Sequence, residues 1–106
     1  MFRTLEVSLE LVRSLREVVR RLGTVDRDLA AQIRRAASSA TLNLAEGNGR
    51  SGKDRHYSFR VARGSVLEVQ AGLRLAVAWG YLDEVHLERP LALTSDLLGM
   101  LTGLLR

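Results

Sequence analysis

The stretch from Lys53 to Trp79, "KDRHYSFRVARGSVLEVQAGLRLAVAW", is apolar at helical spacing and predicts one long α-helix. One face of this helix carries apolar residues three and four positions apart: Phe59, Ala62, Val66, Val69, Leu73 and Ala76. This spacing is typical of shallow, left-handed packing between neighbouring helices. No segment of the chain alternates apolar and polar residues in the manner of a strand, so we expect an all-α protein.

The opposite face of the same helix is also apolar. It carries Tyr57, Val61, Leu75 and Trp79, with Gly64, Glu68 and Gly72 among them. The segment before it has a weaker second face at Ala31, Ser38, Leu42 and Ala45. A helix that is apolar on two faces needs two surfaces to pack against, and in a small monomer one face would meet water. We therefore expect a homo-oligomer that buries the second faces; the alternative is that both faces lie within one core.

Glycines divide the chain into segments of helical periodicity, which predict helices at residues 4–22, 26–46, 53–79 and 84–105. The expected inner faces of the other three are Leu5, Leu9, Val12, Leu15, Val19 and Leu22 in the first helix, Leu29, Ile33, Ala36, Ala37, Ala40 and Leu44 in the second, and Leu87, Leu91, Leu98, Leu101 and Leu105 in the fourth. Four helices with short loops in 106 residues predict one domain, an up-down-up-down antiparallel four-helix bundle.

The helix ends carry recognisable signals. Asp26 is a suitable N-cap for the second helix, and Ser51 with Asp54 resembles a capping box at the start of the third. Gly47 is expected to end the second helix. Pro90 has no N–H to donate, so we expect a kink or a late start in the fourth helix.

Composition excludes several classes of protein. The chain has no cysteine, so disulfide frameworks and cysteine-based zinc sites are excluded. The N-terminus lacks the apolar core of a signal peptide, and no apolar run approaches the length of a membrane span. We expect a cytoplasmic protein that makes no membrane contact.

The charge is basic and unevenly placed. The formal net charge is +4, and from Arg13 to Arg74 there are 13 basic and 6 acidic residues. All but one of the basic residues are arginine, which binds phosphates in a bidentate manner, so the balance suits a DNA or RNA partner. The alternative is arginine-rich codon usage on solvated faces. The candidate contacts are Lys53, His56, Arg60, Arg63 and Arg74 on the third helix, Arg34 and Arg35 on the second, and Arg13, Arg16 and Arg20 on the first.

The segment from Asn43 to Arg50, "NLAEGNGR", follows a helix and lacks the GxxxxGK[ST] pattern of a phosphate loop. With "ARGSVLE" at residues 62–68 and "GYL" at residues 80–82, it resembles the signature of bacterial four-helix bundle proteins related to the 23S rRNA intervening-sequence protein. Leu44 stands where that signature usually has isoleucine. The resemblance implies a ring-like homopentamer with a central channel. One branch, the accessory variability determinant of diversity-generating retroelements, binds nucleic acid and partners a reverse transcriptase.

The signature residues are interpreted as structural or interface residues: Asn43, Glu46, Gly47, Arg50, Gly64, Ser65, Glu68 and Trp79. We expect Arg50 to pair with Glu46 or Glu68, and Asn43 and Ser65 to form hydrogen bonds across helices. Gly64 is expected to permit a close approach of backbones.

The sequence carries no pattern for catalysis or for a cofactor. Neither His56 nor His86 has a glutamate three residues before it, as a di-iron bundle requires, and no serine has a positioned base. We therefore expect neither an enzyme nor a metal protein. Three functions remain: a nucleic-acid-binding accessory protein, a protein-interaction scaffold for a reverse transcriptase or another enzyme, and a small-ligand pore or pocket built from the region of Tyr57, Trp79 and Tyr81.

Overall fold

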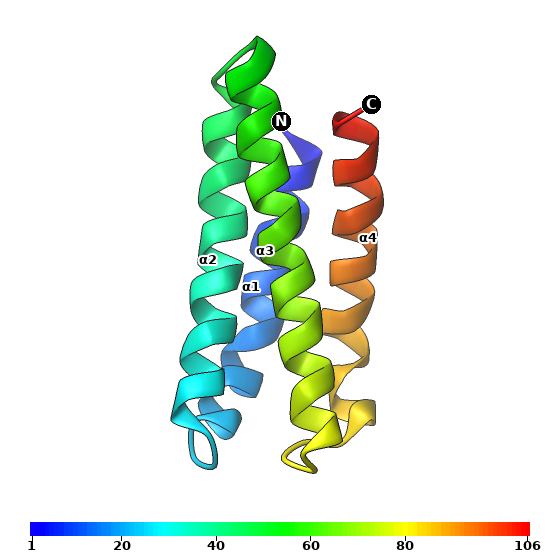
Figure 1. Cartoon of the computed structure of the whole chain (residues 1–106). Coiled ribbons are helices and arrows are strands. Elements are labelled where there is room, and N and C mark those ends of the chain that lie inside the picture. Colours follow the sequence, from blue (N-terminus) through cyan, green and yellow to red (C-terminus); the bar gives the residue numbers. More distant parts are fainter.

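A computed structural model of the chain describes residues 1–106 and contains helices but no strand. The elements are, in order, α1 Arg3–Leu22, α2 Arg27–Asn48, α3 Gly52–Ala78, the 3₁₀ helix η1 Glu84–Leu87, and α4 Glu88–Leu104. The α-helices run alternately up and down, and both chain termini lie at the same end of the bundle (Figure 1). The molecule is elongated, measuring 42 × 22 × 21 Å. The predicted all-α four-helix bundle is therefore confirmed.

Local sequence explains most of the helix ends. The Asp26 carboxylate caps α2 by accepting a hydrogen bond from the Leu29 N–H at 2.9 Å, as expected. Ser51 precedes α3, but its side chain makes no capping hydrogen bond, so the predicted capping box does not form. The chain turns into α3 at Gly52, whose φ of 61° lies in a region that residues with a Cβ rarely adopt.

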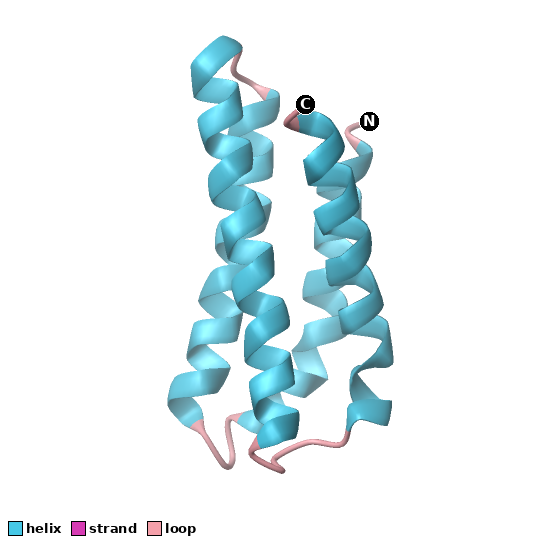
Figure 2. Cartoon of the chain, turned by 45° about the vertical axis from the view of Figure 1, so that its right-hand side comes forward, coloured by secondary structure: helices cyan, strands magenta, loops and turns pink.

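The fourth α-helix begins late. A loop and the turn η1 precede it at the end of the bundle opposite the termini (Figure 2). Pro90 is the third residue of α4, in the first turn, where a backbone N–H has no acceptor within the helix. The late start predicted at Pro90 is confirmed.

The core is one cluster of 22 buried apolar side chains. The inner faces predicted for α2 and α3 are buried in full. In α1 the inner face is rotated from the predicted one, since Val7, Leu11 and Val18 are buried. The predicted residues that are only partly buried are Leu5, Leu9, Val12 and Val19.

In α4 the inner face is also rotated. Leu93 and Leu97 fill the core, whereas the predicted Leu91, Leu98 and Leu105 are partly buried around it. Both α1 and α4 are apolar on more than one face, so spacing alone does not determine which face points inward. Packing against the neighbouring helices determines which face of α1 and of α4 points into the core.

Two glycines bring α2 and α3 close together. A Cβ on Gly47 would lie 2.6 Å from Cε1 of the buried Phe59, and a Cβ on Gly72 would lie 2.7 Å from Cγ1 of Ile33. The expectation that Gly47 ends the second helix is wrong, because α2 continues to Asn48 and buries Gly47 in its last turn. Gly72 likewise belongs to the α2–α3 contact and not to the outer face of α3.

Candidate nucleic-acid interface

A basic groove lies between α3 and α4, and we call it the α3/α4 groove. Its lining residues are Arg60, Arg63, Gly64, Leu67, Thr102, Leu105 and Arg106. Helical spacing places Arg60 and Arg63 one turn apart on the side of α3 that faces α4. No acidic residue lines the groove, and none of its three arginines takes part in an ion pair. The guanidinium groups are therefore available to an external anion.

Other candidate residues of α3 extend this basic line. Lys53 and Arg74 are exposed near opposite ends of the helix, and neither forms an ion pair. Gln70, between Arg63 and Arg74, donates a hydrogen bond to Thr94 Oγ1 of α4 at 3.3 Å. This contact fixes which side of α3 faces α4.

The arginines of α1 and α2 form a separate group. Arg16 and Arg34 border a cavity between α1 and α2, and Arg34 and Arg35 border the adjoining surface of α2. Because α1 and α3 both pack against α2 and α4, the α1/α2 and α3/α4 sides are opposite sides of the bundle (Figure 1). The structure therefore places the predicted arginine and lysine contacts in two groups rather than on one continuous surface.

One of the predicted contact residues, Arg20, already forms an ion pair within α1. Arg20 donates hydrogen bonds to both carboxylate oxygens of Glu17, one of them at 3.0 Å from Nε to Oε2. This pairing holds the pKa of Glu17 below its ordinary value and raises the pKa of Arg20. Arg13, one turn away from Glu17 on α1, is exposed and forms no ion pair.

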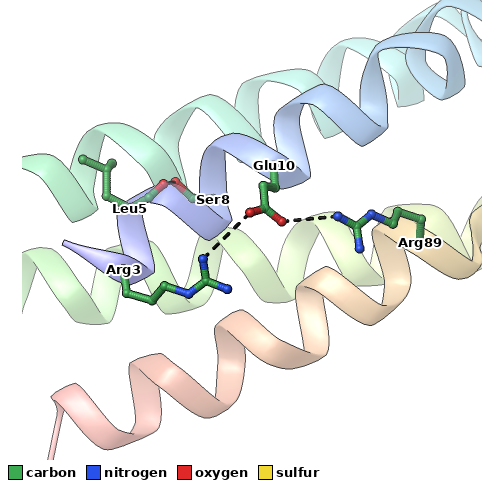
Figure 3. Close-up of polar contacts among 5 residues, drawn as sticks. All are labelled: Arg3, Leu5, Ser8, Glu10 and Arg89. Carbon is green, nitrogen blue, oxygen red and sulfur yellow. Dashed lines mark hydrogen bonds and ion pairs between the residues drawn. The ribbon is translucent and has the colours of Figure 1, made fainter. Parts of the chain in front are cut away.

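On the side of the bundle between α1 and α4, by contrast, part of the positive charge is neutralised. Glu10 of α1 lies between two arginines (Figure 3): its carboxylate is 3.9 Å from Arg3 Nη1 and accepts a hydrogen bond from Arg89 Nη2 of α4 at 3.3 Å. Sequence reasoning missed this contact, since Glu10 and Arg89 lie far apart in the chain and neither belongs to a motif. It leaves less free positive charge on this side.

Several of the signature residues make contacts within the chain. Arg50 donates a hydrogen bond to Glu46 at 3.1 Å and lies 4.0 Å from Asp54, so its pairing is local and does not reach Glu68. Asn43 donates to the Ser39 carbonyl at 2.9 Å within α2, so the predicted bond across helices is wrong for this residue.

Two other signature residues do connect helices. Ser65 of α3 donates a hydrogen bond to Ser39 Oγ of α2 at 3.0 Å, as expected. Glu68 accepts a hydrogen bond from Gln32 Nε2 of α2 at 3.2 Å. These polar contacts determine how α2 and α3 align along their length.

An outer stripe of α3 remains apolar and exposed. Tyr57 is 62%, Leu75 46% and Trp79 65% exposed, and Leu42 on the outer side of α2 is 68% exposed. Gly64 lies on the same stripe, and a Cβ added to it would have no atom within 4 Å, so this position makes no close helix approach within the chain. We use the name outer stripe for Tyr57, Gly64, Leu75 and Trp79.

The aromatic residues do not form one pocket. Trp79 stacks against Tyr81 with ring centroids 6.4 Å apart, but Tyr57 lies at the other end of α3. At 1.5 Å per residue, about 33 Å of helix separates Tyr57 from Trp79. The three residues therefore do not form a small-ligand pocket within the chain. No group of three or more His, Asp or Glu side chains is placed to hold a metal ion.

Comparisons with known proteins agree with this architecture. The family model described as 23S rRNA-intervening sequence protein matches residues 3–103. The structure is similar, with a TM-score of 0.88 and 17% sequence identity, to the crystal structure of a protein with unknown function from the S23 ribosomal protein family from Bacteroides thetaiotaomicron, over 97% of this chain and 98% of that chain. The comparison with curated proteins finds no match. None of the helices is both long and apolar enough to cross a membrane.

Proposed function

The chain belongs to the 23S rRNA-intervening sequence protein family, and on that premise we propose that it is a non-enzymatic accessory protein that binds DNA or RNA. The observation that carries the proposal is the α3/α4 groove, where two arginines of α3 and Arg106, which follows α4, line a surface without a single acidic residue. Arginine forms bidentate hydrogen bonds with phosphate oxygens, so the backbone of a nucleic acid is the expected ligand.

Binding of this kind is governed by counterion release. If the three arginines of the groove each neutralise one phosphate of a duplex, the logarithm of the binding constant falls with the logarithm of salt concentration with a slope of roughly −3 per subunit. The contacts carry no base-specific information, so binding is largely independent of sequence. Aromatic residues make up 5% of the chain, which disfavours recognition of single strands by base stacking.

Assembly would multiply this charge. The exposed outer stripe of α3 supports a homo-oligomer, and the resemblance to the family suggests a ring-like homopentamer. A symmetric ring repeats each groove around its axis and builds a strong field from a modest charge on each subunit. In a retroelement setting, such a ring would present nucleic acid to a reverse transcriptase.

The same outer stripe supports a second candidate function, a protein-interaction scaffold that does not bind nucleic acid directly. Exposed tryptophan and tyrosine are enriched in the energetic centres of protein interfaces. The two functions differ in one measurable respect, because a scaffold would show no affinity for any nucleic acid even at low salt.

The test is a fluorescence anisotropy titration with labelled DNA duplex, RNA–DNA hybrid and single strand across a range of salt concentrations. We expect Arg60→Glu with Arg63→Glu to weaken duplex binding at least about tenfold and to lower the salt slope by roughly 2. The matched control is Arg21→Glu with Arg27→Glu, which makes the same change in net charge at exposed positions away from the groove. Equal losses in the two double variants would reject the groove as the binding surface.

A further inference from the structure

A cavity of about 250 Å³ opens between α1 and α2, on the side of the bundle opposite the α3/α4 groove. We call it the α1/α2 cavity. Its floor is apolar and is formed by Val12, Leu15, Val19 and Ala37. Ligand sites of drug size usually enclose about 300–1,000 Å³, so this volume suits a smaller molecule.

The cavity has a clear origin in the sequence. The residues of α2 that face α1 here are small, Ala37 and Ser38, and they do not fill the space opposite Val12 and Val19. The rotation of α1 that buries Val7, Leu11 and Val18 leaves Val12 and Val19 only partly buried. On the side of α2 that faces α3 there is no such space, because Gly47 of α2 and Gly72 of α3 let the two helices pack in direct contact.

Two arginines border this apolar floor. Arg16 comes from α1 and Arg34 from α2, and the hydroxyl-bearing Ser38 lies beside them. Neither arginine forms an ion pair, and no acidic residue lines the cavity. An anion placed here would therefore meet two uncompensated positive charges with several N–H donors each.

We propose that the α1/α2 cavity binds a small carboxylate with an aliphatic tail, whose carboxylate pairs with Arg16 and Arg34 and whose tail covers the apolar floor. The combination of two unpaired arginines with an apolar floor selects this ligand class. A nucleic-acid phosphate would satisfy the arginines but leave Val12, Val19 and Ala37 facing water. An uncharged hydrocarbon would cover the floor but gain nothing from the two guanidinium groups.

The proposal is tested with octanoate as the probe in a two-dimensional amide NMR titration of the full chain. We expect saturable shifts at the amides of residues 12–19 and 34–38, which line the cavity from its two helices. Octanol, which has the tail without the charge, and acetate, which has the charge without the tail, should each bind at least about tenfold more weakly, because each loses one of the two contributions. Absence of saturable shifts with octanoate would overturn the proposal.

Point variants separate the site from general charge attraction. Arg34→Gln and Arg16→Gln should each weaken octanoate binding about tenfold or more, since each removes a charge-assisted interaction. Arg35→Gln is the matched control, because Arg35 is the exposed neighbour of Arg34 and does not line the cavity. Equal weakening by Arg35→Gln would show non-specific attraction and overturn the proposal.

A second copy of the chain is the competing occupant of the cavity. In that case Ser38→Leu, which adds bulk at the rim, would lower the mass measured by light scattering, and octanoate would not shift the cavity amides at protein concentrations where the assembly is intact. If octanoate binds without changing the mass, the cavity is free in the assembled protein. Loss of duplex binding in the α3/α4 groove variants bears on the nucleic-acid proposal alone.

Discussion

Gly47→Ala tests the closest contact in the bundle. The new methyl group would lie 2.6 Å from Cε1 and 2.8 Å from Cδ1 of Phe59, whose side chain is fully buried. The ring has little room to move. Arg55 lies over it at 4.7 Å while donating a hydrogen bond to the Gly47 carbonyl at 3.2 Å, and Phe2 packs beside it with centroids 6.0 Å apart. The methyl group must therefore displace packed atoms.

The magnitude follows from two opposing effects. Overpacking a well-packed core costs about 1–3 kcal/mol, and so short a contact places this case near the upper value. Alanine favours a helix over glycine by up to about 1 kcal/mol, which offsets part of the cost. We expect a net loss of about 2 kcal/mol in the free energy of unfolding, or a fall of roughly 8–16 °C in Tm for a domain of this size.

The assay is urea unfolding followed by far-UV circular dichroism, at one protein concentration so that any assembly contributes equally. The matched control is Gly99→Ala, the same chemical change in α4 at an exposed position with no atom within 4 Å of the new methyl group. It should be neutral or stabilising by up to about 1 kcal/mol. A Gly47→Ala protein as stable as Gly99→Ala would refute the close packing of α2 on Phe59.

Three further predictions concern the surface and the helix ends. Gly64→Leu on the outer stripe should lower the mass measured by light scattering without changing helix content, because a Cβ at Gly64 would have no atom of the chain within 4 Å; an unchanged mass would place any contact between chains elsewhere. Asp26→Ala removes the hydrogen bond to the Leu29 N–H and should cost about 1 kcal/mol in urea unfolding, whereas Asp26→Asn should retain most of the stability. Glu17 has a lowered pKa because Arg20 donates hydrogen bonds to it. Any stabilisation by this pair is therefore fully present at pH values above the ordinary pKa of a glutamate, and it is lost as the pH falls through the lowered pKa of Glu17. Since the pair is exposed, Glu17→Gln should leave the urea midpoint at neutral pH unchanged, and a clear shift would contradict this expectation.

The glycines show where local spacing misassigned a role: at Gly47 the position is special for another reason than predicted, and at Gly64 the predicted contact is made by another glycine. The sequence predicts that Gly47 stops a helix, but this residue lies within α2 and admits the ring of Phe59. It also predicts a close approach at Gly64, but Gly72 has that role within the chain. A glycine in a helical pattern indicates a special position, whereas the atom that approaches it belongs to another helix and cannot be read from local spacing.

The candidate site could be predicted only in part. The excess of arginine between Arg13 and Arg74 is visible in the sequence, and so is the placement of Arg60 and Arg63 one turn apart. The sequence does not reveal that the basic residues lie on opposite sides of the bundle, because that depends on which helices become neighbours. The Glu10–Arg89 contact was missed for the same reason.

The sequence by itself determined the four helices, their approximate ends, the inner faces of α2 and α3 and the basic balance of the chain. These properties depend on residues a few positions apart, whose relation is set by the period of the helix. Only the tertiary structure decided which faces of α1 and α4 point inward, which glycines touch a neighbour, and that small side chains on α2 leave a cavity beside Arg16 and Arg34. Those outcomes depend on how all four helices fill one shared space, and close packing makes each helix's rotation depend on its neighbours.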